Sequence, residues 1–161
     1  MSDLLTSLTL ARLDVDRAAE RRGDTAWFDA AWADPATRVL VLHRGRARVT
    51  GDDAPALLLV PPSEVEQDGV RVLLAVDEGT TYVGLLVDGA VEPFDEGARW
   101  EGLREVGALL TPLESSLLVA AVALGNWHAT HPRCPRCGVP SVPSDSGWAR
   151  RCPDDDSQHF P

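Results

Sequence analysis

The segment that decides the fold is Cys134-Pro135-Arg136-Cys137-Gly138, and 14 residues separate Cys137 from the later Cys152-Pro153-Asp154-Asp155. Two residues between the first thiols let both sulfurs approach one ion with tetrahedral geometry, and Gly138 permits the positive φ that such a turn needs. A second Cys-x-x-Cys would complete a zinc site, but its last position holds Asp155. The chain has three cysteines, all in its last 28 residues, and an odd, clustered set favours metal binding over disulfides.

The fourth ligand of such a site has several candidates. A carboxylate oxygen of Asp155 can bind zinc at about 2.0–2.2 Å, although structural sites seldom use one. His159 offers a nitrogen instead, whereas His131, three residues before Cys134, is more typical of a surface residue. The remaining alternative is a site without metal, whose thiols pack as small apolar groups. We expect structural zinc on Cys134, Cys137, Cys152 and Asp155, with His159 as the alternative fourth ligand.

Residues 131–161 differ in composition from everything before them. They are rich in proline and aspartate and contain almost no aliphatic side chains. A segment with this little apolar surface cannot form a core alone. Residues 131–161 therefore need a metal ion or a neighbouring domain to fold. We therefore divide the chain into a lead domain (1–99), a helical connector packed on it (100–130) and a small zinc-ribbon-like module (131–161).

The lead domain alternates short apolar runs with turn residues, which predicts a mainly antiparallel sheet. Residues 38–43 and 47–50 flank Arg44-Gly45-Arg46, and residues 70–76 and 80–87 flank Asp77-Glu78-Gly79, so both pairs read as hairpins. Residues 56–60 read as a further strand, and residues 24–32 as a short helix whose aromatic residues pack in the core. The fold class expected is α+β.

The connector is predicted to be helical. Thr111-Pro112-Leu113-Glu114 has the pattern of a capping box, with Thr as N-cap, Pro at the first helical position and Glu at the third. Apolar residues then recur at helical spacing up to an end near His128, forming one face: Leu113, Leu117, Ala120, Ala121, Leu124 and Trp127.

Charge and hydropathy limit the possible partners. The net charge is −10, with 25 acidic and 15 basic residues, which argues against a nucleic-acid backbone as the partner of this chain alone. No apolar run approaches the roughly 18 residues of a membrane span, and the N-terminus lacks the features of a signal peptide. We therefore expect a cytoplasmic protein with no membrane partner.

Trp100, Leu103-Arg104 and Trp127-His128 precede the Cys134-x-x-Cys137-Gly138 turn, and with these residues the sequence from residue 100 onward resembles the NADH pyrophosphatase family of NUDIX hydrolases. In that family, a tryptophan and Leu-Arg lead to a helix ending in Trp-His, a Cys-x-x-Cys-Gly turn follows, and a return strand carries the next cysteine. The matching residues are Trp100, Leu103-Arg104, Gly107, Leu110, the helix 114–124, Trp127-His128, His131, Cys134, Cys137-Gly138, Gly147, Arg151-Cys152 and His159-Phe160-Pro161. The first hundred residues fit the family's lead domain, a degenerate NUDIX-like fold, more loosely.

The resemblance implies a parent enzyme that splits the pyrophosphate of NAD(H) into AMP and nicotinamide mononucleotide, some members removing NAD caps from RNA. Catalysis there needs a glutamate-rich signature that holds Mg²⁺ or Mn²⁺. The signature's relative spacing is matched by Glu96, Arg104, Glu105 and Val106. However, Ala90 stands where the signature has its first glycine, and Ala108 and Leu109 stand where it has two metal-binding glutamates.

We therefore assign no catalytic residue and expect no NAD(H) hydrolysis by this chain. The chain also ends where the family continues into its catalytic domain. It is expected to be the non-catalytic N-terminal portion of an NAD(H) diphosphatase, which serves as a metal-stabilised scaffold. The resemblance further implies a homodimer of the parent, with NAD(H) bound only at full length. The alternative is a free-standing zinc-ribbon module that binds a protein partner and has no enzymatic activity.

Overall fold

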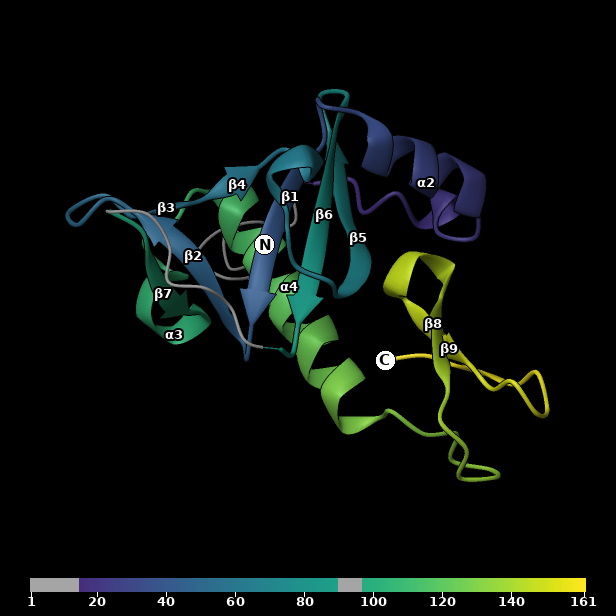
Figure 1. The fold of residues 1–161 in the computed structure, drawn as a ribbon. Coiled ribbons are helices and arrows are strands. Elements are labelled where there is room, and N and C mark those ends of the chain that lie inside the picture. Colours follow the sequence, from purple (N-terminus) through teal and green to yellow (C-terminus); the bar gives the residue numbers. More distant parts are fainter. Residues whose placement is uncertain (1–14, 90–96) are drawn as a thin grey trace, which may run out of the picture.

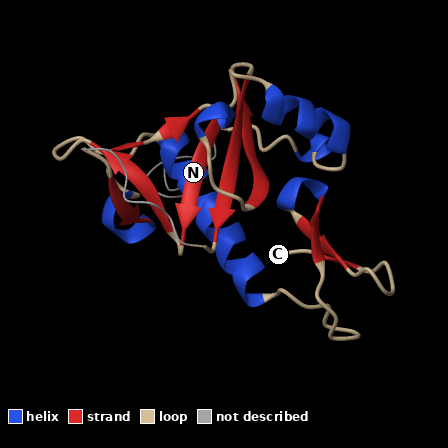
Figure 2. Ribbon diagram, in the orientation of Figure 1, coloured by secondary structure: helices blue, strands red, loops and turns tan. Residues whose placement is uncertain are grey.

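The computed structural model describes residues 15–89 and 97–161, and its main feature is one large sheet (Figure 1). Helix α4 packs on one face of this sheet, α2 packs on the other, and a small C-terminal sheet lies beside them (Figure 2). In chain order the elements are η1 (Ala19–Arg21), α2 (Thr25–Ala33), β1 (Arg38–His43), β2 (Arg46–Thr50), β3 (Ala56–Leu57), β4 (Leu59–Val60), η2 (Pro62–Glu64), β5 (Val70–Asp77), β6 (Thr80–Val87), β7 (Arg99–Gly102), α3 (Leu103–Val106), α4 (Pro112–Thr130), β8 (Val142–Ser144), η3 (Asp145–Gly147), β9 (Ala149–Arg151) and β10 (Gln158–His159).

The seven-stranded sheet has the order β3-β2-β1-β6-β5, with β4 paired to β1 and β7 paired to β2. Among the described strands of this sheet, only β1 and β6 pair in parallel, so the mainly antiparallel α+β fold predicted from the sequence is confirmed. Both predicted hairpins form. Their two-residue turns place Arg44-Gly45 and Glu78-Gly79 at positive φ, which suits the right-handed twist of the paired strands.

Three local features differ from the sequence prediction. Residues 56–60 form two short strands instead of one, because β3 pairs with the end of β2 and the chain then crosses to pair β4 with the start of β1. The stretch predicted as a helical connector begins with strand β7, which pairs with β2. Helix α4 continues to Thr130, two residues beyond the predicted end near His128.

The core fills both faces of the sheet because side chains alternate along β5 and its partners. Val72 and Leu74 face α4, whereas Leu73 packs with Phe28 of α2 on the opposite face. The apolar face predicted for α4 is buried at four of its positions, and Leu118 joins them: Leu117, Leu118, Ala120, Ala121 and Leu124. Within residues 15–89 and 97–161, no helix combines the length and apolar character needed to cross a membrane.

Helix α4 starts at the capping box that the sequence predicted. The Thr111 hydroxyl accepts a hydrogen bond from the Glu114 N–H, and the Glu114 carboxylate accepts one from the Thr111 N–H. The other oxygen of Glu114 accepts the N–H of Leu57 at 2.8 Å. One carboxylate therefore caps the helix and ties it to strand β3.

Candidate metal centre

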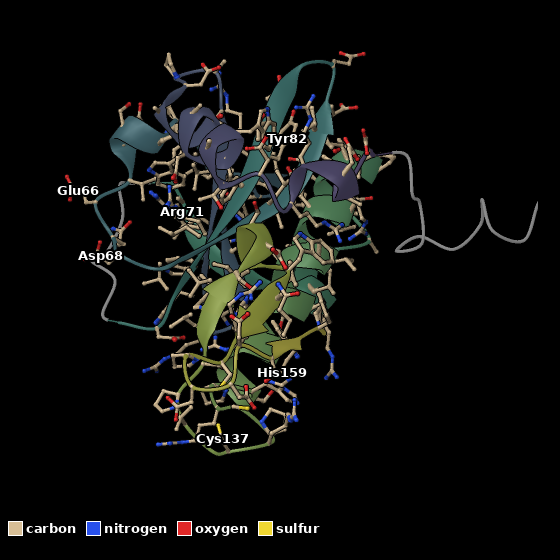
Figure 3. The ribbon with its side chains drawn as sticks, turned by 90° about the vertical axis from the view of Figure 1, so that its right-hand side faces the viewer. Glu66, Asp68, Arg71, Tyr82, Cys137 and His159 are labelled. Carbon is tan, nitrogen blue, oxygen red and sulfur yellow. The ribbon has the colours of Figure 1, made fainter. Side chains whose placement is uncertain are left out.

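Two tight turns at one end of the small sheet β10-β9-β8 bring the cysteines together. In the first turn, the Gly138 N–H donates to the Cys134 carbonyl at 2.9 Å, and Gly138 has a φ of 80°. In the second, the Asp156 N–H donates to the Cys152 carbonyl at 3.1 Å, and Asp156 has a φ of 56°. Cys137 lies at the end of the molecule remote from Tyr82 of the large sheet (Figure 3).

The structure places Cys134, Cys137, Cys152 and Asp155 in one cluster, with one ligand atom of each within 4.8 Å of all the others. The sulfurs of Cys137 and Cys152 are 3.5 Å apart. Sulfurs bound at about 2.3 Å in a tetrahedron stand about 3.8 Å apart, so a zinc ion requires only a small adjustment. Three thiolates and one carboxylate also suit zinc chemically, because soft sulfur ligands select it over Mg²⁺ or Ca²⁺. The cluster is therefore suited to a metal ion.

The two histidines considered as ligands lie outside this cluster. His159 Nε2 is 3.1 Å from the hydroxyl of Ser157, which also hydrogen-bonds to the Asp155 carboxylate. His131 follows the end of α4, where it stacks on Trp127 and its Nδ1 lies 3.2 Å from the Trp127 carbonyl. In this arrangement, His159 lies beside the cluster and acts on Cys134 as well as on Ser157, whereas His131 is an exposed helix-end residue.

The environment lowers the pKa of two candidate ligands, Cys134 and Asp155, and raises the pKa of Cys152. Burial alone would raise the pKa of Cys134, but hydrogen bonds from the backbone of Cys137 and Arg136 and from the side chains of Ser157 and His159 together lower it to about 6. Burial raises the pKa of Cys152 to about 12. Hydrogen bonds from Ser157 lower the pKa of Asp155 to about 2. These shifts favour negative charge on Cys134 and Asp155, while Cys152 loses its proton when a cation replaces it.

The other end of the small sheet rests on the edge strand β5. The Trp148 indole N–H donates to the Leu73 carbonyl at 2.6 Å, and the Arg22 guanidinium stacks on the Trp148 ring, 3.5 Å from its centroid. The Ser146 hydroxyl donates to the Arg22 carbonyl at 2.9 Å. An edge strand exposes backbone groups that would otherwise pair with another chain, so these contacts protect β5 as well as anchoring the small sheet.

Among residues 15–89 and 97–161, the positions at the NUDIX signature spacing belong to no metal-binding cluster. Glu105 lies on the short helix α3 and faces Arg46, with 3.8 Å between the carboxylate and the guanidinium. The next two signature positions are Ala108 and Leu109, and Leu109 is 65% exposed. The other two positions at this spacing, Ala90 and Glu96, lie outside the described residues.

Two family models match the chain in the same order as the two parts of the structure. The NADH pyrophosphatase-like rudimentary NUDIX domain matches residues 36–127, and the NADH pyrophosphatase zinc ribbon domain matches residues 129–160. The fold and the cysteine cluster thus define a rudimentary NUDIX domain followed by a zinc ribbon. The zinc expected from the cysteine spacing agrees with this ribbon and with its cluster of three cysteines and one aspartate.

Similar proteins extend the match to nearly the whole chain. The NAD-capped RNA hydrolase NudC of Mycobacterium tuberculosis (strain H37Rv) is 32% identical over 94% of this chain, as is that of Mycobacterium bovis (strain AF2122/97). The NudC of Stutzerimonas stutzeri (strain A1501) is 37% identical over 40% of this chain and 24% of its own length. The chain belongs to the NADH pyrophosphatase family of NUDIX proteins. It spans about half, 49%, of the length of the mycobacterial relatives.

Proposed function

We propose that this chain is the non-catalytic N-terminal portion of an enzyme that hydrolyses the pyrophosphate of NAD(H), free or as the cap of an RNA. With NADH and water the products would be AMP and reduced nicotinamide mononucleotide. The observation that carries the proposal is the match itself: 94% of this chain aligns with 49% of proteins named NAD-capped RNA hydrolases. Alanine and leucine at positions 108 and 109 support a non-catalytic role, because neither side chain can bind Mg²⁺ or Mn²⁺.

The role proposed for the ribbon is structural. Cys134, Cys137, Cys152 and Asp155 would hold one zinc ion and so fix two turns that have no apolar core of their own. The direction in which the parent chain leaves the ribbon would then be set by the two positive-φ turns, at Gly138 and Asp156, and by the contact of Trp148 with β5. A homodimer of the parent and the division into residues 1–99, 100–130 and 131–161 belong to the same proposal, on the strength of the family resemblance.

Metal analysis tests the proposed zinc site. Elemental mass spectrometry of the purified chain should find about one zinc per chain, and Cys152→Ser should lose most of it because only three ligands remain. The matched control is Val142→Ser, which alters a 53% exposed residue of the same small sheet outside the cluster. Zinc absent from the unaltered chain in chelator-free buffer, or retained in full by Cys152→Ser, would contradict the ligand set.

Two activity measurements test the scaffold role. The chain alone, incubated with NADH and Mn²⁺, should release no AMP above the blank. A chimaera in which this chain replaces the matching half of the Mycobacterium tuberculosis relative should hydrolyse NADH, and it should lose activity with Cys152→Ser but not with Val142→Ser. AMP release by the chain alone would refute the non-catalytic role. A folded, zinc-loaded chimaera without activity would favour an independent interaction module.

A further inference from the structure

A buried polar cluster joins helix α4 to the ribbon, and its histidine, His128, lies six residues before the first candidate ligand, Cys134. It consists of His128 near the end of α4, Arg150 on β9 and Ser141 before β8, which are 6%, 8% and 5% exposed. Buried polar groups are costly unless they are hydrogen-bonded, so a fully connected cluster at a junction has structural consequences.

The hydrogen bonds define one protonation state of His128. Its Nε2 lies 2.9 Å from the Gly147 carbonyl oxygen, and its Nδ1 lies 2.9 Å from Nη1 of Arg150. A carbonyl only accepts and a guanidinium only donates, so Nε2 carries the hydrogen and Nδ1 is the acceptor. Arg150 also donates from Nε to the Ser141 hydroxyl at 2.9 Å and from Nη2 to the Ser141 carbonyl. The imidazole is therefore neutral.

The charges around His128 favour this neutral form. Burial lowers its pKa below 6.5, and the adjacent charge of Arg150 lowers it further. The hydrogen bond to Gly147 and the more remote carboxylate of Asp88, after β6, act in the opposite direction without reversing the shift. Asp145 is the carboxylate on η3, the element that carries Gly147, and it accepts a 2.9 Å hydrogen bond from Gln158. On its own helix, His128 packs against the uncharged ring of Trp127.

We propose that His128 is a pH-sensitive latch between the rudimentary NUDIX domain and the zinc ribbon, closed when the imidazole is neutral and released when Nδ1 takes up a proton. A protonated Nδ1 would present a donor to the Arg150 donor and place two cations in contact in a buried site. Gly147, the residue that His128 holds through its carbonyl, packs directly on the backbone of Arg71 and Val72 in β5. Release of Gly147 would therefore weaken the packing of the ribbon on β5.

The sign of the pH effect follows from linkage. Because the pKa of His128 is lower in the docked state than the ordinary 6.5, the undocked state binds more protons below that pH. Docking is therefore at full strength above pH 6.5 and weakens as the pH falls below it. One pH unit below 6.5, the docking equilibrium can weaken by up to about tenfold.

Hydrogen exchange of the zinc-loaded chain tests the latch. Between pH 7.5 and 5.5, amides of β5, η3 and β9 should lose protection by up to about tenfold after correction for intrinsic exchange rates. His128→Gln keeps an amide N–H donor and an oxygen acceptor but cannot be protonated, so it should abolish this acid response. His131→Gln, which removes an exposed histidine near the same helix end, should leave the response unchanged. Zinc content is measured in every sample, and only fully loaded samples are compared.

A second measurement keeps the proposal testable if His128→Gln does not fold. Nitrogen chemical shifts of the unaltered chain should show His128 with hydrogen on Nε2 at pH 7.5 and a pKa below 6.5. An equal acid response in His128→Gln, or titration of His128 at or above 6.5, would overturn the latch. Neither result depends on any enzymatic activity, so the proposed function would stand or fall separately.

Discussion

Replacing Gly147 with alanine directly tests how the ribbon sits on the sheet. Gly147 has a φ of 81°, and a Cβ added there would lie 2.3 Å from Cγ1 of Val72, 2.7 Å from the Arg71 carbonyl oxygen and 2.9 Å from Cα of Val72. Two of these three atoms belong to the backbone of β5. The overlap therefore cannot be relieved by rotating one side chain, and the ribbon must move away from the edge strand.

The expected cost has two parts. An L-residue in the left-handed region costs about 1–2 kcal/mol, and forcing an extra carbon into a close-packed contact typically costs about 1–3 kcal/mol. Gly147→Ala should therefore lower the stability of the docked state by about 2–5 kcal/mol. The matched control is Gly79→Ala, because Gly79 has a φ of 83° but its Cβ would meet nothing within 4 Å. The control should cost only the first part, about 1–2 kcal/mol.

Urea unfolding and hydrogen exchange of β5 would measure the two variants side by side, with zinc content determined for each. The two variants should differ in their free energy of unfolding. In a thermal scan of a chain of this size, each kcal/mol of that difference corresponds to about 2–4 °C in Tm, which is large enough to measure. A Gly147→Ala variant no less stable than Gly79→Ala, with β5 equally protected, would refute the contact between the ribbon turn and the edge strand.

Three further outcomes are expected. Thr111→Ala should lower the free energy of unfolding by about 1 kcal/mol in urea titrations, and Glu114→Ala should cost about 1–3 kcal/mol more, because it also leaves the Leu57 N–H without its acceptor. Asp155→Cys should slow zinc transfer to a chromogenic chelator and Asp155→Ala should speed it, since one restores a fourth thiolate and the other removes a ligand. Zinc affinity in competition titrations should rise from pH 6 to pH 8, because zinc competes with protons for thiols such as Cys152, whose pKa is raised to about 12.

Local sequence patterns predicted those parts of the fold that depend on local chemistry. The hairpin between β5 and β6 was predictable because Glu78-Gly79 supplies a two-residue turn between two apolar runs. The start of α4 was predictable because Thr111 and Glu114 satisfy each other's backbone groups within four residues. Strand β7 was not predictable, because its pairing partner β2 lies about 50 residues earlier and its four residues, Arg99–Gly102, are too few to establish an alternating pattern.

The metal cluster was also predictable from local sequence patterns, whereas the contacts that dock the ribbon on α4 and β5 were not. Spacing alone placed three cysteines and Asp155 together, because short turns determine where their side chains point. The partners of His128 lie on η3 and β9, 19 and 22 residues later in the chain, and the partner of Trp148 lies on β5, 75 residues earlier. Nothing in the sequence around His128 or Trp148 indicates such distant partners. The contacts that dock the ribbon on α4 and β5 could therefore be seen only in the folded structure.

The ribbon is thus restrained at two ends by different chemistry. At its tip, the proposed zinc would fix the turns that carry Cys137 and Asp155, and protons or chelators would weaken that restraint. At its base, Trp148 and Gly147 contact β5, and the state of His128 governs that restraint without touching any ligand. Removing zinc should therefore expose the tip to exchange while β5 stays protected at pH 7.5, whereas acid should release the base first in a zinc-saturated chain. The order of these two losses distinguishes a ribbon held only by its metal from one that is also docked.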